Sequence, residues 1–329
     1  MPDPAVARDL ECGVFLDVDT VDTGDLNRSP LTGVMPCWRW YPVRDPTAVE
    51  DRLAGAGVAV TNKVLLDEAR LARAQGEGLR LVCVAATGTN NVDLEAARRL
   101  GLAVANVPAY ATPAVVQHVF ALVLALTTRL LEYRAAVAAG RWSAADRFCL
   151  LDYPIRELAG KTFGIVGYGQ LGQAVARVAE AFGMTVLVAE RRGEPVRPGR
   201  LPLEDLLPRV DVLSLHCPLT PETRGLIGVA ELGRMRPDAV LVNTARGGIV
   251  DESALAEALR VGRIGGAGID VLSREPPPAE NPLLATDIPN LIVTPHTAWA
   301  SREARQRVLE EIALNVSAFR AGETRNRVV

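Results

Sequence analysis

The glycine-rich segment at residues 167–172 constrains the fold of this chain more than any other feature. Gly167, Gly169 and Gly172 form a G-x-G-x-x-G pattern directly after the apolar run 163–166 and before the apolar helical stretch 174–182. In such a loop the first glycine permits a tight turn, the second lets the backbone approach a pyrophosphate, and the third allows close packing of helix and strand. The segment therefore predicts a dinucleotide site with the phosphates at a helix N-terminus.

An acidic residue stands where a dinucleotide site needs one. Glu190 ends the next apolar run, about 20 residues after the loop, where a carboxylate accepts hydrogen bonds from the adenine ribose. Arg191 and Arg192 follow at once, and a guanidinium favours the 2′-phosphate that a carboxylate repels. We therefore expect NAD as coenzyme, with use of NADP open. The alternative is that both arginines are solvated surface residues.

Apolar runs recur along the chain, separated by polar or glycine-containing stops and helical stretches. In the second part they lie at 163–166, 184–189, 210–215, 239–242, 266–269 and 291–293. Strands that alternate with helices predict an α/β fold with a doubly wound parallel sheet of the Rossmann type. Runs at 14–16, 58–60, 81–85 and 102–105 predict a smaller α/β unit. Two domains also agree with 329 residues, more than one core usually serves.

Two long helical stretches complete the expected architecture. Residues 113–139, closed by Gly140, are expected to form a helix that joins the two units. Polar residues interrupt the apolar segment 115–131, so we expect a buried or interfacial helix there and no membrane span. The last helix, 301–321, has a possible N-cap at Ser301 and ends at a glycine.

Composition limits the partners. The formal net charge is −3 without a long run of Lys or Arg, so neither nucleic acid nor a membrane is an expected partner. The first nine residues contain no apolar segment typical of a signal peptide. The five cysteines are far apart, at Cys12, Cys37, Cys83, Cys149 and Cys217. Because none forms a CxxC pattern and each has apolar residues close by in sequence, we expect reduced thiols and no metal site. Together with the N-terminus, this leads us to expect a cytoplasmic protein.

Only three histidines compete for the role of a general acid. His118 lies within an apolar helical stretch and is expected to be a core or interface residue. His216 ends the run 210–215 and is expected to be structural, with a place in the coenzyme cleft as the alternative. His296 follows the last apolar run, which makes it the candidate acid.

Arg246 and Glu275 also follow predicted strands. In an open parallel sheet the ligand crevice lies outside the carboxyl ends of the strands, so both should converge with His296. Reduction of a 2-keto acid needs a hydride at C2, a proton for the carbonyl oxygen and a cation for the carboxylate. We interpret His296 as the acid, Glu275 as its orienting partner and Arg246 as the cation. The alternative is a pair of surface salt bridges and a strand-capping histidine.

Several motifs are similar to those of the D-isomer-specific 2-hydroxyacid dehydrogenases, and among them to bacterial glycerate dehydrogenases, also called hydroxypyruvate reductases. Beside the glycine loop they are A-A-T-G-T-N-N-V-D at 85–93, H-C-P-L-T at 216–220, N-T-A-R-G-G at 243–248 and T-P-H-T-A-W-A-S at 294–301. This resemblance covers nearly the whole chain. It implies that Arg246, Glu275 and His296 are catalytic.

The resemblance also implies binding residues. Backbone amides of Thr87 and Gly88 are expected to hold the substrate carboxylate, together with Arg246 and His296. Trp299 could wall the substrate pocket and favour a short side chain, with ordinary packing as the alternative. The residues expected to line the coenzyme are Thr112, Gly167, Gly169, Gln170, Leu171, Gly172, Glu190, Arg191, Cys217, Pro218, Thr223, Thr244, Ala245 and Asp270.

The same resemblance implies a discontinuous substrate-binding domain, 1–108 with 298–329, around a dinucleotide-binding domain at 109–297. The smaller domain is expected to have a flavodoxin-like fold, and the chain to form a homodimer through residues 113–155. Many family members carry Asp in the place of Glu190, and some NADPH-using reductases carry Arg near Arg191, which leaves the coenzyme preference open.

The sequence therefore leads to a hypothesis about the reaction. We expect NAD(P)H-dependent reduction of hydroxypyruvate to D-glycerate, with glyoxylate as a second substrate. One alternative is a dehydrogenase for another short D-2-hydroxy acid. The other is a non-catalytic protein that binds NADH as a sensor.

Overall fold

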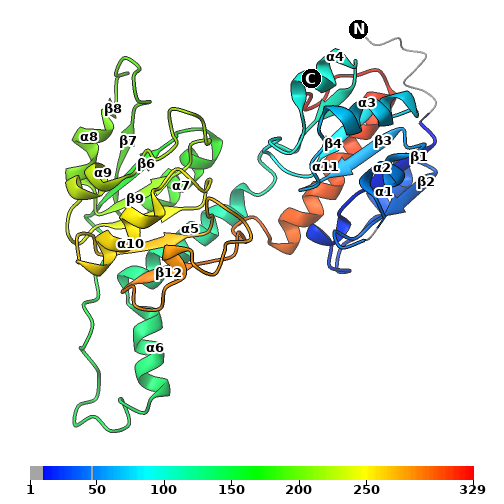
Figure 1. Cartoon of the computed structure of the whole chain (residues 1–329). Helices are drawn as coiled ribbons and strands as arrows, with labels where there is room; N and C mark the ends of the chain where they lie inside the picture. Colours follow the sequence, from blue (N-terminus) through cyan, green and yellow to red (C-terminus); the bar gives the residue numbers. More distant parts are fainter. Residues whose placement is uncertain (1–9, 46) are drawn as a thin grey trace. The chain divides into compact units, whose positions relative to one another are not determined.

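The computed structural model describes residues 10–45 and 47–329, which form two compact units. One unit combines Met1–Ala111 with Ala300–Val329, and the other comprises Thr112–Trp299. Both are drawn in Figure 1. The N-terminal segment on which the signal-peptide expectation rests lies outside the described residues.

The first unit is built on a parallel five-stranded sheet with the order β2-β1-β3-β4-β5. The order matches that of flavodoxin-like folds. Its strands are β1 (Cys12–Phe15), β2 (Cys37–Trp40), β3 (Val58–Thr61), β4 (Leu81–Val84) and β5 (Ala103–Ala105). Strand β2 was not predicted, because this edge strand, C-W-R-W, is only partly buried and contains no apolar run.

Helices cover both faces of this sheet. They are α1 (Ser29–Val34), α2 (Val49–Leu53), α3 (Glu68–Gly76), α4 (Leu94–Arg99) and α11 (Arg302–Arg320), with a 3₁₀ turn at Val18–Thr20. The returning helix α11 packs Val308, Ile312 and Val316 against one face. The predicted N-cap is confirmed, since the Ser301 hydroxyl accepts a hydrogen bond from the Ala304 amide at 3.2 Å.

The expectation of reduced thiols is wrong for one pair. Cys12 and Cys37 are register partners on adjacent strands β1 and β2, and their sulfurs form a disulfide. Register pairing across two strands is a long-range consequence of the fold, which spacing along the chain does not reveal. Cys83, Cys149 and Cys217 are free thiols.

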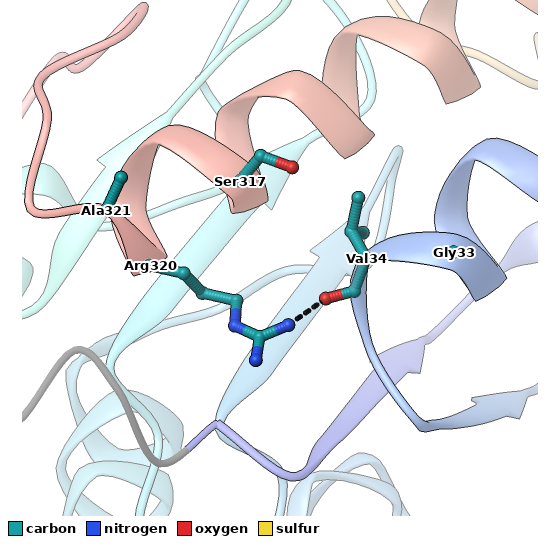
Figure 2. A pocket seen from close by; sticks show the side chains of 5 residues that line it. All are labelled: Gly33, Val34, Ser317, Arg320 and Ala321. Carbon is teal, nitrogen blue, oxygen red and sulfur yellow. Dashed lines mark hydrogen bonds between the residues drawn. The ribbon is translucent and has the colours of Figure 1, made fainter.

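A shallow pocket lies between α1 and α11 of the first unit (Figure 2). Its lining residues are Gly33, Val34, Ser317, Arg320 and Ala321. The Arg320 guanidinium donates a hydrogen bond to the carbonyl oxygen of Val34, so its charge serves to join the two helices. The pocket contains none of the predicted site residues.

The second unit contains a parallel seven-stranded sheet with the order β12-β11-β10-β9-β6-β7-β8. Its strands are β6 (Thr162–Val166), β7 (Thr185–Ala189), β8 (Arg200–Leu201), β9 (Val212–Leu215), β10 (Val240–Asn243), β11 (Gly266–Ile269) and β12 (Leu291–Val293). Six of them confirm the predicted runs, and β8, of two residues, was not predicted. The first strand β6 lies between β7 and β9, so the order reverses there as in a Rossmann fold.

Helices pack on both sides of this sheet as well. They are α5 (Thr112–Thr127), α6 (Leu130–Ala138), α7 (Gln170–Ala181), α8 (Leu203–Leu206), α9 (Val229–Arg234) and α10 (Glu252–Arg260), with 3₁₀ turns at Leu207–Arg209 and Pro282–Leu284. Helix α5 packs closely on β11: a Cβ atom added to Gly268 would lie only 2.9 Å from the Cβ of Leu122, so glycine permits this approach.

The helical stretch expected at 113–139 is largely helical but not continuous, because the structure divides it into α5 and α6 with a bend of 60°. Arg129 adopts a left-handed backbone with φ of 57°. The Thr128 hydroxyl donates to the carbonyl of Leu124 at 2.6 Å, a side-chain bond that competes with the helix ladder. No single helix among the described residues is long and apolar enough to cross a membrane, and the pair α5–α6 meets only the criteria of length and composition.

Candidate coenzyme and catalytic site

The glycine loop has the geometry that its pattern predicts. Gly167 follows β6 with φ of 93°, and a Cβ there would lie 2.6 Å from backbone atoms of His216 and Cys217. A Cβ at Gly172 would lie 2.2 Å from the carbonyl oxygen of Gly167, so neither position has room for a side chain. At Gly169 a Cβ would meet nothing within 4 Å, which leaves open space at the N-terminus of α7.

Glu190 lies at the end of β7, as predicted, but its carboxylate is already bound by side chains of this chain. The side chain of Arg197 donates to both carboxylate oxygens, from Nε at 2.7 Å and also from Nη2. The Arg191 amide donates at 2.8 Å, and Arg200 Nη1 lies 3.5 Å away. The hydrogen bonds from Arg197 hold the pKa of Glu190 far below its ordinary range. A ribose would therefore meet a neutralised carboxylate.

The other arginines here have distinct positions. Arg192 is paired with Glu231 on α9 at 2.8 Å. Arg200 stacks its guanidinium over the ring of Tyr168, inside the glycine loop, at 5.9 Å from the ring centre. Arg197 thus remains the arginine that binds Glu190 most closely, and sequence analysis did not single it out.

His296 and Glu275 form the predicted pair. His296 Nδ1 lies 2.5 Å from Glu275 Oε2, and Glu275 Oε1 accepts a hydrogen bond from the Leu272 amide at 2.9 Å. The carboxylate is thereby fixed at one oxygen and orients the imidazole with the other. Because Nδ1 faces the carboxylate, Nε2 is the ring nitrogen that can face a substrate. The two side chains are 28% and 34% exposed, so the pair is accessible.

Arg246 lies beyond the end of β10, the strand beside β11, and therefore on the same edge of the sheet as His296. Its Nη1 donates to the carbonyl of Ala245 at 2.7 Å, while its own carbonyl oxygen accepts from Asn243 at 3.0 Å. The residue is partly exposed at this edge. The structure thus places a cation at the predicted edge, held by its own strand end.

Asp270 is 1% exposed and follows β11. Its carboxylate accepts hydrogen bonds from the amides of Thr297 and Ala298, each at 2.9 Å, and from the Thr294 hydroxyl at 2.5 Å. All these donors belong to the turn that carries His296. His118 Nε2 lies 3.0 Å from the Thr294 hydroxyl. His118 was expected only as a core or interface residue, and no role was predicted for Thr294.

Two buried polar atoms at this edge lack partners in the described structure, His216 Nδ1 and Thr244 Oγ1. The other ring nitrogen of His216 shares a hydrogen bond with the Ser214 hydroxyl at 2.9 Å. Burial lowers the pKa of His216 to about 4, so the ring is neutral at pH 7. Burial also raises the pKa of the Cys217 thiol. Together with the open space at Gly169, these orphaned atoms fit a polar coenzyme across the sheet's carboxyl edge.

The remaining predicted residues are at various places in the two units. Gln170 and Leu171 begin α7, and the Thr223 hydroxyl donates to the carbonyl of Pro218 at 2.7 Å. Ala245 follows β10, Thr112 begins α5, and Trp299 ends the second unit.

In the first unit, Thr87 and Gly88 follow β4, and the Thr87 hydroxyl donates to the Val107 carbonyl at 2.9 Å. Among the described residues no group of three or more metal-binding side chains occurs.

Comparisons with known proteins agree on one family. The family model described as D-isomer specific 2-hydroxyacid dehydrogenase, NAD binding domain, matches residues 120–298. A glycerate dehydrogenase of Methylorubrum extorquens is 46% identical over 86% of this chain and 88% of its own. A hydroxypyruvate reductase of Blautia hydrogenotrophica is 35% identical over 96% and 98%. A glyoxylate reductase of Korarchaeum cryptofilum is 42% identical over 74% of each.

Solved structures share the fold. A D-lactate dehydrogenase of Aquifex aeolicus, in complex with NAD and lactic acid, is 29% identical with a TM-score of 0.79, covering 96% of this chain and 99% of that one. An acyclic imino acid reductase in complex with NADPH and D-Arg is 26% identical with a TM-score of 0.83, covering 97% and 100%. Both nicotinamide coenzymes thus occur among structural relatives of this chain.

Proposed function

Because the chain belongs to the D-isomer specific 2-hydroxyacid dehydrogenase family, we propose that it reduces hydroxypyruvate to D-glycerate with NAD(P)H. Glyoxylate is the second substrate that we propose. The observation that carries this proposal is the hydrogen bond between His296 Nδ1 and Glu275 at the carboxyl edge of the sheet. An imidazole held in this way can present Nε2 as a proton donor at the same edge of the sheet as the glycine loop. The names of the similar proteins support the choice of substrates.

In the proposed reaction the residues of this chain supply the proton and the positive charge that binds the substrate, and the coenzyme supplies the hydride. A bound reduced nicotinamide supplies a hydride for C2 of the keto acid. Nε2 of protonated His296 gives its proton to the carbonyl oxygen as that oxygen gains charge. Glu275 fixes the ring through the contact between its Oε2 and His296 Nδ1. Arg246 is positioned at the same edge to bind the substrate carboxylate and polarise the carbonyl. The products are the D-2-hydroxy acid and oxidised coenzyme, with neutral His296.

The coenzyme-binding residues follow from the second unit. The amides at the start of α7 are suited to the pyrophosphate, and the gap at Gly169 allows close approach. His216 and Thr244 offer buried polar atoms without other partners in the described structure. We assign Cys217, Pro218, Ala245 and Asp270 to the coenzyme site from their positions just after strands. Thr223, whose hydroxyl donates to the Pro218 carbonyl, is assigned to the same site, and Thr112 to its nicotinamide end. Thr87, Gly88 and Trp299 are proposed to contact substrate.

The bound state of Glu190 supports use of both coenzymes. A carboxylate that selects NADH must be free to accept hydrogen bonds from ribose hydroxyls and to repel a 2′-phosphate. Here the guanidinium of Arg197 donates to both carboxylate oxygens, and Arg200 Nη1 adds a second positive charge 3.5 Å from Oε1. We therefore propose that NADPH as well as NADH serves this enzyme.

The segment after α5 supports a homodimer. Helix α6 and residues 139–157 extend away from the sheet of the second unit (Figure 1). Tyr133 and Tyr153 join the two limbs of this arm, since the Tyr133 hydroxyl donates to the Tyr153 carbonyl at 2.8 Å. Phe148 is 91% exposed and Leu151 is 76% exposed. Large apolar side chains exposed together indicate a contact surface, and we propose that a second copy of the chain covers them, in a cytoplasmic homodimer.

Turnover distinguishes this proposal from its alternatives. The initial rate of NADH loss is measured with hydroxypyruvate, glyoxylate and pyruvate, and again with NADPH. The proposal predicts fast turnover of hydroxypyruvate, slower turnover of glyoxylate and use of both coenzymes. Faster turnover of pyruvate would favour a dehydrogenase for another short D-2-hydroxy acid. Tight binding of NADH without turnover of any keto acid would favour a non-catalytic sensor.

A further inference from the structure

We infer that His118 is a positioning residue for His296, acting through Thr294 and Asp270. The inference rests on the proposed role of His296 as the acid and adds a residue on α5 to the machinery of the reaction. The chain of contacts runs from a helix that covers the sheet to the turn at its carboxyl edge. His118 contacts the Thr294 hydroxyl, and that hydroxyl donates to Asp270, so a shift of one side chain would shift the next.

The turn that carries His296 requires external support. His296 has φ of 54°, a left-handed backbone that a residue with a side chain rarely adopts unless its surroundings hold it there. Its amide donates to the backbone carbonyl of Asp270 at 2.8 Å and to that of Thr294 at 3.0 Å. These two bonds fix the backbone of the turn directly before the imidazole.

The carboxylate of Asp270 supplies the rest of the support. Being 1% exposed, it is shielded from water, so its hydrogen bonds to Thr294, Thr297 and Ala298 are not in competition with solvent. These three residues enclose His296 from both sides along the chain. A shift of the carboxylate would therefore displace the imidazole from Glu275.

His118 determines where this carboxylate and the Thr294 hydroxyl lie. A threonine hydroxyl has a single hydrogen, and Thr294 gives it to Asp270 Oδ1 at 2.5 Å. The hydroxyl oxygen must then accept from His118 Nε2 at 3.0 Å, which places a hydrogen on that nitrogen. The same nitrogen lies 3.5 Å from Asp270 Oδ1. The neutral ring provides this donor in its Nε2–H tautomer.

Helix α5 gives the donor a fixed origin. Val119 and Val123 on α5 are fully buried, and Leu122 packs directly on Gly268 of β11, two residues before Asp270. His118 is therefore anchored by the packing of its neighbours and directs Nε2 at the turn. The His118 imidazole therefore supports the turn that carries His296, in addition to filling space.

The test uses two variants of His118 and a matched control. His118→Phe keeps the ring volume and removes the donor, whereas His118→Gln returns an N–H donor near the place of Nε2. Gln117→Ala changes the exposed neighbour on the same helix. For each variant we would measure kcat and KM with hydroxypyruvate, the dissociation constant of NADH, and amide hydrogen exchange of residues 294–298.

The inference predicts that His118→Phe lowers kcat about tenfold with the dissociation constant of NADH within about twofold of wild type. Exchange of the Thr297 and Ala298 amides should accelerate by about tenfold or more. His118→Gln should recover most of both effects, and Gln117→Ala should resemble wild type. The primary deuterium isotope effect on kcat should rise in His118→Phe, because a displaced acid slows the chemical step.

Two results would overturn the inference. One is unchanged exchange at Thr297 and Ala298 in His118→Phe. The other is equal behaviour of the Phe and Gln variants, which would assign the effect to packing. Hydrogen exchange requires no turnover, so it tests the positioning role even if the wild-type protein reduces none of the keto acids, a result that would contradict the proposed function alone.

Discussion

Two buried carboxylates, one in each unit, hold turns in the same way but for different purposes. Asp17 follows β1 and accepts hydrogen bonds from the amides of Asn62, Lys63 and Val64, the shortest at 2.6 Å, in the turn after the neighbouring strand β3. Asp270 follows β11 and binds the turn after its neighbour β12. In each case the carboxylate of one strand end fixes the adjacent turn.

The difference lies in what supports each carboxylate and what its turn carries. Asp17 is bound by backbone amides, and burial raises its pKa in spite of them. Asp270 is bound by two amides and by a hydroxyl that is itself held by His118. The turn held by Asp270 carries an imidazole paired with Glu275. The same arrangement of a strand-end carboxylate and an adjacent turn thus occurs in both sheets, and only in the second does the turn carry the side chain that we propose as the acid.

The largest expected effect concerns the side chain that distinguishes the two turns. His296→Asn keeps a polar side chain of similar size but removes the acid, so kcat with hydroxypyruvate should fall about 1000-fold. NADH binding, measured by fluorescence titration, should remain within about threefold of wild type. A variant that keeps more than a tenth of the wild-type kcat would show that another group donates the proton.

The second effect separates the units by their response to acid. The pKa of His216 in the second unit is lowered by burial from the ordinary 6.5 to about 4. The unfolded state therefore binds the proton first, and the stability present above pH 6.5 is lost as the pH falls toward 4. The loss should reach about 3 kcal/mol at about pH 4.

In the first unit Asp17 should respond to acid in the opposite way. Its raised pKa makes protonation easier in the folded state than in the unfolded state. Its contribution to stability should therefore grow as the pH falls through the raised pKa. Hydrogen exchange followed by mass spectrometry, read separately for the two units, measures both trends. His216→Gln should flatten the trend of the second unit, and an unchanged slope in that variant would contradict the assignment.

A third effect tests the two carboxylates directly. Asp270→Asn puts an amide hydrogen where the turn offers donors, so the His296 turn should loosen and kcat should fall about 100-fold. Asp17→Asn makes the matching change in the first unit and should alter the free energy of unfolding by about 1–3 kcal/mol, with much less change in kcat. Steady-state kinetics and urea unfolding of both variants provide the comparison. Equal losses of kcat would remove the distinction between them.

The smallest effect concerns a third strand-end carboxylate, Glu190, which is held by a guanidinium as well as by amides. Arg197→Gln should free this carboxylate, and the ratio of kcat/KM for NADPH to that for NADH should fall about tenfold. The ratio of the affinity for 2′,5′-ADP to that for 5′-AMP, measured by calorimetry, should fall as well. Arg192→Gln is the matched control, because Arg192 pairs with Glu231. Equal ratios in the two variants would contradict the role of Arg197.

Local patterns in the sequence predicted much of the second unit. Its six apolar runs became strands, the glycine loop adopted the expected turn, and His296 met Glu275. Each of these depends on residues close in sequence or on the rule that parallel strands end at one edge. The direct role of Arg246 on substrate stays a prediction.

Long-range contacts account for what the sequence did not reveal. The disulfide between Cys12 and Cys37 depends on strand register, and the hydrogen bond of His118 to Thr294 joins residues 176 positions apart. Arg197 reaches Glu190 from a loop without a recognisable motif. The break between α5 and α6 arises from one left-handed residue, Arg129, which no glycine or proline marked.

The most direct test of the central claim is a single turnover with hydroxypyruvate. Enzyme in excess over NADH is mixed with the keto acid, and the loss of nicotinamide absorbance is followed together with the configuration of the glycerate formed. We predict one D-glycerate for each NADH consumed. Persistent absorbance with NADH bound, or formation of L-glycerate, would contradict the assignment of this chain as a D-2-hydroxyacid dehydrogenase acting through His296.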